Sequence, residues 1–474
     1  MHDAIIIGSG PNGLAAAIHL ARQDLSVAVY EAEATVGGGT RTRELTLPGF
    51  KHDLCSAIHP MAKASPFLQS LPLEEYGLEW IHPEVPVAHP LDDQPAGALF
   101  HCLEQTVAHL EEDGETYRRS IGPLIHSWKQ LLPDILAPFS LTPGHPFTMA
   151  RFGLQALRSA EGFTRRFDTS KARALFAGLA GHGILPFDKP ATAAIGLVLG
   201  VAAHTVGWPY PKRGSHEITK AMAGYLESLG GTIYTGHPVT SVEQLPESKT
   251  VLFNTTPKQI LDIAGDALPQ GYARKLRRFN YGCGVYKMDW ALSEPIPWSD
   301  ELCHKAGTVH LGGTYGEIAA SEQATARGQH SDRPYVLVAQ QSLFDDSRAP
   351  SGKHTCWAYC HVPNGSEADM SEPILQQIER FAPGFRDCII GQHSMNTVDL
   401  QAYNSNYIGG DINGGKQDLS QMFTRPAGLF DPYHIPNTQF YICSSSTPPG
   451  GGVHGMCGYH AARSALDRQF QKTL

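Results

Sequence analysis

The sequence has no excess of basic residues. Its 37 lysine and arginine residues are outnumbered by 46 aspartate and glutamate residues, which gives a formal net charge of −9 with histidine neutral. Nucleic-acid binding draws much of its affinity from lysine and arginine side chains that replace counterions on phosphates. The composition therefore disfavours a nucleic-acid partner.

Long apolar runs are also missing, and we expect no secretory leader. No uninterrupted apolar run approaches the roughly 18 residues of a membrane-spanning helix. The chain starts Met1-His2-Asp3 and continues directly into an apolar segment, without the basic region and small-residue cleavage site of a signal peptide. We therefore expect a cytoplasmic protein, and we leave open a peripheral contact with a membrane.

Cysteine is sparse, with nine residues, an odd number, scattered over 474 positions. Such a long chain with few cysteines does not have the composition of a disulfide scaffold. Cys356 and Cys360, with His361 directly after them, form one Cys-x-x-x-Cys without a matching second pair. Because a structural zinc ion needs a closed set of four ligands, we predict buried free thiols and no metal site.

Glycine, by contrast, is concentrated near the start of the chain. A G-x-G-x-x-G motif lies between the apolar segment 4–8 and a run of helix-forming residues, and reads Gly8-Ser9-Gly10-Pro11-Asn12-Gly13. Gly8 permits a tight turn, Gly10 lets a pyrophosphate approach the backbone, and Gly13 lets the helix pack closely on the strand. The free N–H groups at the helix N-terminus would then face the phosphates.

Glu31 strengthens this interpretation, because it ends the next apolar segment, 26–31. A carboxylate at this distance from the glycines can accept hydrogen bonds from ribose hydroxyls. The order strand, helix, strand is that of a Rossmann βαβ unit.

A second glycine cluster follows Glu31 and favours FAD over NAD as the bound dinucleotide. It contains Gly38, Gly39, Thr40 and Arg41. The glycines supply a further backbone surface for the diphosphate, and Arg41 could offset its charge or contact the flavin region. Domains that bind only NAD do not need this extension, although the sequence leaves open whether NAD(P) also takes part.

These motifs resemble the flavin-binding start of the phytoene dehydrogenase-like and amine oxidase superfamily of FAD-dependent oxidoreductases. The segment 443–456, which reads CSSSTPPGGGVHGM, resembles the carboxy-terminal flavin motif of the phytoene dehydrogenase-like proteins. The resemblance implies that Gly451, Gly452 and Val453 present N–H groups to the flavin O2, where they would stabilise negative charge. It further implies cofactor contacts from four other residues, namely Val239 (to the adenine), Thr255, His454 and Met456.

The expected fold is α/β, with a Rossmann-type FAD-binding domain and a second α+β substrate domain that combines a mixed sheet with a helical insert. A chain of this length predicts two domains. The FAD-binding domain is expected to be discontinuous, with residues 1–74, 214–268 and 411–474. The substrate domain takes residues 75–213 and 269–410, with a helical lid at about 104–203. Two later segments are predicted as helices, 372–381 and 385–392.

Three residues are candidates for catalysis, namely His59, His454 and Lys287. Histidine transfers protons near neutral pH, and a lysine that reaches flavin N5 through water is familiar in amine oxidases. Each histidine could equally be a structural hydrogen-bonding group, and Lys287 could pair with an acidic neighbour or simply be exposed to solvent.

The leading functional hypothesis is a dehydrogenase or desaturase that transfers hydride from a lipophilic, isoprenoid or polyene compound to flavin N5. The apolar helical lid suits such a substrate, although its residues could also fill the core of the second domain. Two alternatives stay open: an amine-oxidase-like enzyme that produces hydrogen peroxide, and a flavin-binding structural protein without catalysis. The electron acceptor could be oxygen, a quinone or NAD(P), and a homo-oligomer is compatible with the sequence.

Overall fold

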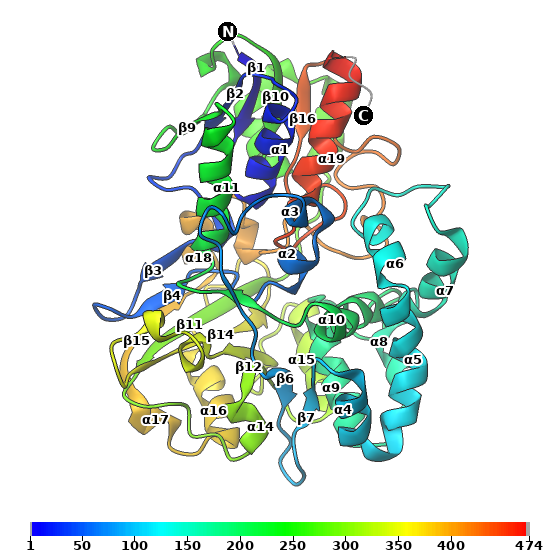
Figure 1. The fold of residues 1–474 in the computed structure, drawn as a ribbon, viewed down its shortest axis with the longest axis vertical. Coiled ribbons are helices and arrows are strands. Elements are labelled where there is room, and N and C mark those ends of the chain that lie inside the picture. The colour runs from blue at the N-terminus through cyan, green and yellow to red at the C-terminus, as the bar shows by residue number, and fades with distance from the viewer. Residues whose placement is uncertain (1, 471–474) are drawn as a thin grey trace.

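A parallel five-stranded sheet forms one end of the molecule in the computed structural model, which describes residues 2–470 (Figure 1). Its strands follow the order β16-β10-β1-β2-β9, with the bounds β1 (His2–Ile7), β2 (Val27–Tyr30), β9 (Thr232–Tyr234), β10 (Ser248–Phe253) and β16 (Phe440–Ile442). In the central strand β1, Ile5 pairs with Val251 of β10 and with Ala28 of β2. The apolar runs that form these central strands are buried because helices cover both faces of the sheet.

The helices on one face bring the two ends of the chain together. α1 (Pro11–Ala21), α11 (His216–Ser228) and α19 (Met456–Ala465) lie side by side there (Figure 1). Ala4 and Ile6 of β1 pack beneath these helices. Ile5 and Ile7 pack on the opposite face, against α12 (Pro257–Ala264) and α13 (Gln270–Leu276).

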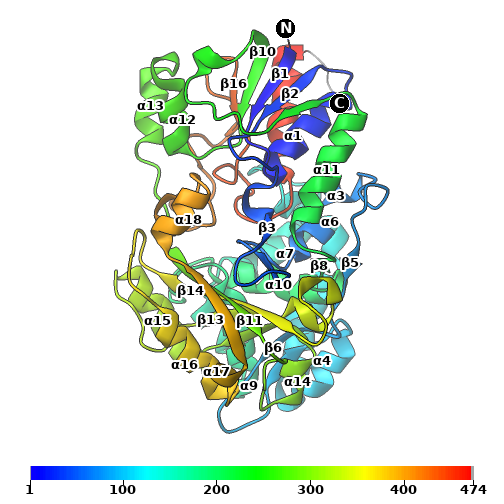
Figure 2. The ribbon, with the colours of Figure 1, turned by 90° about the vertical axis from the view of Figure 1, so that its left-hand side faces the viewer.

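A mixed seven-stranded sheet forms the other end of the molecule (Figure 2). Its order is β15-β11-β14-β13-β12-β6-β7, with the bounds β6 (Val85–His89), β7 (Gly97–Leu99), β11 (Gly284–Leu292), β12 (Ala306–Leu311), β13 (Val336–Ala339), β14 (His354–Val362) and β15 (Ile389–Met395). Neighbouring strands are antiparallel, except that β12 and β6 run parallel. One face packs against α16 (Ser371–Phe381) and buries the free thiols of Cys356 and Cys360.

The helical insert packs on the opposite face of this sheet (Figure 1). Its helices are α4 (Leu103–His109), α5 (Gly114–His126), α6 (Trp128–Ile135), α7 (Pro146–Ala156), α8 (Ala160–Thr164), α9 (Ser170–Gly181) and α10 (Ala193–Thr205). α15 (Tyr315–Ala326), from the second half of the chain, contacts α9.

The predicted helix 385–392 is wrong over its second half. α17 (Phe385–Cys388) is a single turn, and the edge strand β15 starts at Ile389. β15 pairs with β11, so that His393 lies opposite Asp289. This pairing satisfies the backbone groups of β15, and such a tertiary contact overrides a local preference for helix.

The remaining strands and α-helices are short. They are the ribbons β3–β4 (Thr42–Glu44 and Lys51–Asp53) and β5–β8 (Trp80–Ile81 and Tyr210–Pro211), and the helices α2 (Pro60–Ala64), α3 (Pro66–Gln69), α14 (Glu301–His304) and α18 (Thr397–Tyr403). α18 lies between the two sheets (Figure 2). Within residues 2–470, every helix is too short or too polar to cross a bilayer.

The predicted fold class, α/β with a Rossmann-type sheet and a second mixed sheet, is confirmed. Strands of the first sheet come from three separate stretches of the chain, 2–30, 232–253 and 440–442. The domain boundaries themselves stay a prediction.

Candidate functional site: a cavity between the two sheets

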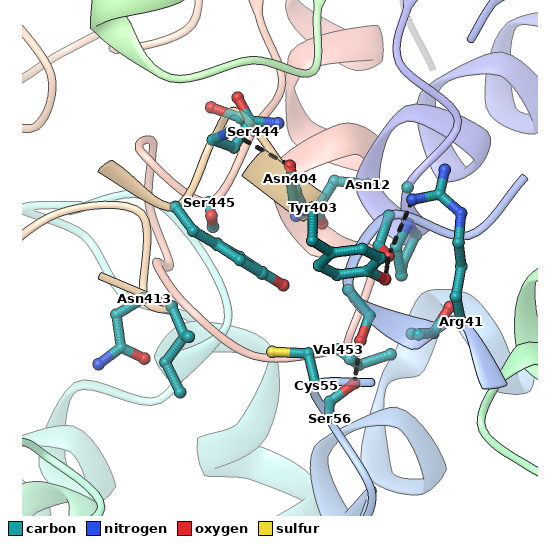
Figure 3. Close-up of a pocket in the computed structure, with 18 of the residues that line it drawn as sticks. Asn12, Arg41, Cys55, Ser56, Tyr403, Asn404, Asn413, Ser444, Ser445 and Val453 are labelled. Atoms are coloured by element: carbon teal, nitrogen blue, oxygen red, sulfur yellow. Dashed lines mark hydrogen bonds between the residues drawn. The ribbon is translucent and has the colours of Figure 1, made fainter. Parts of the chain in front are cut away.

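A cavity of about 730 Å³ lies between the two sheets. Both glycine-rich segments border it, through Gly10 near the start of the chain and Gly452 near its end. Figure 3 shows Asn12 and Arg41 on one side of the cavity and Ser445 on the opposite side. The volume is in the upper part of the range that ligand pockets have, roughly 300–1,000 Å³.

The first glycine turn joins β1 to α1 in a conformation that requires glycine. Gly8 has a φ of 96°, which side chains with a Cβ rarely adopt. A Cβ on Gly13 would overlap the carbonyl oxygen of Gly8. The Asn254 amide, at the end of β10, donates to that same carbonyl at 3.2 Å. The N-terminus of α1, with its unpaired N–H groups, therefore borders the cavity.

Glu31 lies at the cavity wall with both carboxylate oxygens engaged. One oxygen accepts from the Ser9 N–H at 2.8 Å and from the Ser9 hydroxyl at 2.6 Å. The other accepts from the Glu33 N–H at 3.0 Å and from the Arg41 guanidinium at 3.1 Å. A carboxylate has about four lone-pair positions, so a ribose hydroxyl would have to replace one of these donors.

Arg41 lines the cavity, but it donates its hydrogen bonds to Glu31 and to residues of the preceding loop, which follows Glu31. Its guanidinium pairs with Glu31 and donates twice to the carbonyl oxygen of Thr35, at 2.8 and 3.1 Å. The Tyr403 ring lies 5.8 Å from it, and the Tyr403 hydroxyl donates to Gly38 O at 2.6 Å (Figure 3). Arg41 therefore closes the loop between Glu31 and the second glycine cluster, and the Tyr403 hydroxyl ties that cluster to α18.

The carboxy-terminal loop places fewer of its predicted residues on the wall. Gly452 and Val453 line the cavity, whereas Gly451, His454 and Met456 do not. A Cβ on Gly451 would lie 2.8 Å from the Gln417 amide and 3.1 Å from the Cα of Asn413, so packing around this glycine is tight. The buried His454 ring accepts from the Met456 N–H at 3.0 Å and supports the start of α19.

On the nucleotide side of the wall, three buried polar atoms have no hydrogen-bond partner among the described residues. They are Asn12 Oδ1, His59 Nδ1 and Thr255 Oγ1. Buried polar groups are normally paired, so unpaired ones on a cavity wall mark positions that a polar ligand can satisfy. Val239, predicted to contact adenine, lies on the same wall.

His59 is held in place by a chain of buried contacts across the two halves of the molecule. Its Nε2 is 2.7 Å from the Ser215 hydroxyl, and the Ser215 N–H donates to Asp53 at 2.8 Å. Asp53 is ion-paired with Arg348 at 3.1 Å. Burial lowers the pKa of His59 to about 4, which keeps the imidazole neutral near pH 7.

Lys287, the second candidate on the wall, projects from β11. It is 2% exposed and pairs with Asp289, two residues along the same strand. Asp289 also lies 3.5 Å from the Nδ1 of the buried His52. Although burial opposes it, the neighbouring ammonium holds the pKa of Asp289 below its usual value. The Trp357 ring lies 5.8 Å from the Lys287 ammonium.

The structure thus brings most of the predicted site residues to one cavity. Those on its wall are Gly8, Gly10, Pro11, Asn12, Glu31, Gly38, Gly39, Thr40, Arg41, His59, Val239, Thr255, Lys287, Gly452 and Val453. Those outside the wall are Gly13, Gly451, His454 and Met456, each of which packs against backbone or a neighbouring loop.

Sequence reasoning missed several wall residues. Asn254 was recognisable, because it ends a buried parallel strand and ligands gather at the carboxyl ends of such strands. Tyr403 and Tyr407 belong to no motif, and only the position of α18 brings them to the second glycine cluster: a Cβ on Gly39 would overlap the Tyr407 hydroxyl.

The comparisons with known proteins agree with this geometry. Residues 6–71 match the family described as NAD(P)-binding Rossmann-like domain. Pyridine nucleotide-disulfide oxidoreductase domain-containing protein 2 of Rattus norvegicus is 25% identical over 97% of this chain and 92% of its own length. The phytoene dehydrogenase of Streptomyces griseus is 22% identical, covering 82% of this chain and 77% of its own. The predicted resemblance to phytoene dehydrogenase-like proteins is confirmed.

The fold is shared with amine oxidases. Cyclohexylamine oxidase from Brevibacterium oxydans IH-35A superposes with a TM-score of 0.60 at 13% identity, over 99% of this chain and 100% of that chain. The chain therefore has a dinucleotide-binding fold that is found among oxidoreductases. Although the rat relative is named for disulfide chemistry, Cys55 is the single cysteine on the described cavity wall, so no dithiol pair is present there.

Proposed function

We propose that this chain is an FAD-dependent oxidoreductase that oxidises or desaturates a neutral lipophilic substrate. The observation that carries the proposal is the single cavity, which joins two glycine-rich segments to the inner face of the second sheet. FAD would supply the hydride acceptor, at flavin N5, and the chain supplies binding, orientation and exclusion of water.

The residues of the nucleotide side fit FAD. The backbones at Gly10 and Gly38 approach closely, since a Cβ on Gly38 would lie 3.0 Å from the Gly10 Cα. Side chains at these positions would fill the space that a diphosphate needs. A ribose hydroxyl could replace the Ser9 hydroxyl on Glu31, because a serine hydroxyl rotates freely. Asn12 and Thr255 offer further polar atoms without partners.

The substrate side of the wall favours a neutral apolar compound. It contains Ile184, Leu199, Trp208, Leu337, Trp357 and Tyr359. Among the described residues of the predicted substrate domain, no carboxylate lies on the wall, since Asp289 is behind it and is engaged by Lys287. The ammonium group of an amine substrate would therefore lie near the Lys287 ammonium and would have no carboxylate of its own to pair with. This disfavours an amine as the substrate.

His59 is suited to receive a proton from the carbon next to the one that loses hydride. With Nε2 protonated and donating to Ser215, Nδ1 is an acceptor at the cavity wall that no protein group uses. A neutral imidazole whose pKa is about 4 is a weak base, and a weak base suffices where hydride loss makes the neighbouring proton acidic.

Absorbance tests the cofactor. The purified chain, incubated with excess FAD and desalted, is expected to retain a flavin spectrum. Anaerobic mixing with neutral isoprenoids and polyenes should then bleach the flavin, whereas primary amines should not. A colourless protein after reconstitution would refute the proposal, and bleaching by amines followed by rapid reoxidation in oxygen would identify an amine-oxidase-like enzyme instead.

Two histidine substitutions test the proton acceptor. His59→Gln keeps the position of Nε2 but removes Nδ1, and should slow flavin reduction about 100-fold or more. His454→Asn is the matched control, because His454 is buried with an equally low pKa, about 4, but lies off the wall. It should leave the reduction rate unchanged. Equal rates in both variants would remove His59 from the mechanism.

A further inference from the structure

The wall that faces the substrate is an ordered grid of side chains. Pairing across the sheet places Lys287 of β11 opposite Tyr359 of β14, Tyr359 opposite Leu337 of β13, and Leu337 opposite His310 of β12. The next row on the same face is Asp289, Trp357, Ala339 and Thr308. Residues two apart on a strand point to the same face, so both rows lie on the face of the sheet that borders the cavity. The members that line the cavity itself are Lys287, Leu337, Tyr359, Trp357 and Thr308.

The chemistry changes from one end of this grid to the other. The β11 end is charged, through Lys287 and Asp289. The middle is aromatic and aliphatic, through Trp357, Tyr359 and Leu337. The β12 end is polar and neutral. Three strand spacings separate the two ends, which is about 14 Å.

The charged end is the one nearer the second glycine cluster. Lys287 acts electrostatically on Cys55, and the N–H of the next residue, Ser56, donates to Gly39 O at 3.1 Å. A substrate whose reacting carbon lies at the glycine-lined part of the cavity therefore extends along the grid toward β12.

Thr308 at the β12 end has an unmet hydrogen-bonding capacity. It is 2% exposed, it lines the cavity, and its hydroxyl has no partner among the described residues. An unpaired buried hydroxyl destabilises the folded state, and valine would fill the same shape without that cost. The position thus carries a polar atom that the fold itself does not use.

A pair of histidines lies beside Thr308. The Nε2 atoms of His182, on the wall, and His310, behind it, are 3.0 Å apart. Burial lowers the pKa of His182 to about 3 and that of His310 well below its ordinary value. The neutral His182 ring and the Thr308 hydroxyl border the cavity and can hydrogen-bond an uncharged oxygen group, and they offer no charge to an ionic one.

We propose that the substrate carries a neutral oxygen group, a hydroxyl or a carbonyl, at the end remote from the reacting carbon, and that Thr308 binds this group. Between the two ends the substrate presents an apolar stretch about 14 Å long. The inference rests on the proposed function only in placing the substrate in this cavity. The indole N–H of Trp357 is also unpaired on this wall, and the experiment separates the two donors.

The test measures binding of farnesol and farnesene, which share an isoprenoid skeleton. Farnesene lacks the terminal hydroxyl and has one more carbon–carbon double bond, and both are otherwise apolar. Quenching of tryptophan fluorescence reports binding, because Trp208 and Trp357 line the cavity. The purified full chain, with and without FAD, should bind farnesol about tenfold more tightly, as one net hydrogen bond predicts. Thr308→Val should abolish this preference, whereas Thr308→Ser and Trp357→Phe should retain it.

Thermal unfolding confirms that the variants are folded, and Thr308→Ala replaces the valine variant if the latter is not. Equal affinities of the wild type for the two probes, an undiminished preference in Thr308→Val, or no binding of either probe would overturn the inference. Because the readout is binding, failure to retain FAD would refute the proposed function while a Thr308-dependent preference for farnesol still stands.

Discussion

The two glycine-rich segments that border the cavity differ in how often they need glycine for backbone conformation. In the turn 8–13, Gly13 is needed because a Cβ would overlap the backbone of Gly8. In the loop 450–455, Gly450, Gly452 and Gly455 all have positive φ, at 110°, 121° and 70°, so glycine mainly permits the path of the chain. Positive φ is thus confined to Gly8 in the first segment and is frequent in the second, whereas each segment also has a glycine, Gly13 or Gly451, that neighbouring atoms crowd. We expect a side chain at Gly10, on the cavity wall, to affect ligand binding and a side chain at Gly451, off the wall, to affect folding.

The contact that joins the two segments should be the most sensitive. A Cβ on Gly458 of α19 would overlap the carbonyl oxygen of Asn12 in α1. Gly458→Ala should lower the free energy of unfolding by about 3 kcal/mol or more, because two backbones must separate. Chemical denaturation measures the change. In the control Gly271→Ala, on α13, the Cβ meets no atom within 4 Å, and a gain of up to about 1 kcal/mol is expected. Equal stability of the two variants would contradict the close contact.

Two alanine variants separate binding from folding. At Gly10 the nearest atoms to a Cβ are Asn254 Nδ2 at 3.1 Å and Gly38 Cα at 3.8 Å, so the fold should accept alanine. On the proposed function, Gly10→Ala weakens FAD binding about 30-fold, or about 2 kcal/mol, at an unchanged unfolding temperature. Gly451→Ala should instead lower the unfolding temperature, because its Cβ would lie 2.8 Å from the Gln417 amide, 2.9 Å from Asn413 Oδ1 and 3.1 Å from the backbone Cα of Asn413. Titration with FAD measures the affinity, and thermal unfolding measures the stability of each variant. A lower unfolding temperature in Gly10→Ala together with weaker FAD binding in Gly451→Ala would contradict the roles assigned to the two glycines.

Low pH should reduce the stability of the folded protein, because His454 in the carboxy-terminal segment then becomes protonated. Burial lowers the pKa of this histidine from 6.5 to about 4, so the unfolded state binds more protons between these values. Its contribution to stability is complete above pH 6.5 and declines toward pH 4, at up to about 1.4 kcal/mol per pH unit. His454→Asn, which keeps an acceptor for the Met456 N–H, should reduce the slope of unfolding free energy against pH by about one proton. If the variant has the same slope as the wild type, His454 takes up a proton in the folded state as readily as in the unfolded state, and its pKa is not lowered by burial.

The smallest effect is expected at Ser9 in the first turn. Its hydroxyl is one of four donors to Glu31, and Ser9→Ala should cost about 1 kcal/mol of stability or less. On the proposed function, FAD affinity stays within about twofold of the wild type, because a ribose hydroxyl takes the vacated position. Calorimetric titration measures the affinity. A large loss would mean that the Ser9 hydroxyl contacts the cofactor directly.

The features that sequence reasoning anticipated are those set by neighbours in the chain. The turn at Gly8 and Gly13 depends on backbone sterics within one βαβ unit, and Glu31 follows from the length of that unit. The helix predicted at 385–392 failed because pairing with β11 decides the conformation of residues 389–395. His454 was assigned to the cofactor from its motif, yet packing at the start of α19 turns its ring away from the wall.

The amino-acid sequence by itself determined the dinucleotide-binding turn, because φ, ψ and the absence of a Cβ act over a few bonds. Only the tertiary structure decided what faces that turn across the cavity. Lys287 and Thr308 are far apart from His59 in the chain, and strand pairing and helix packing bring them to one wall. Hydrogen-bonding groups are left unpaired there, such as the Thr308 hydroxyl, and which groups these are depends on every element packed around them.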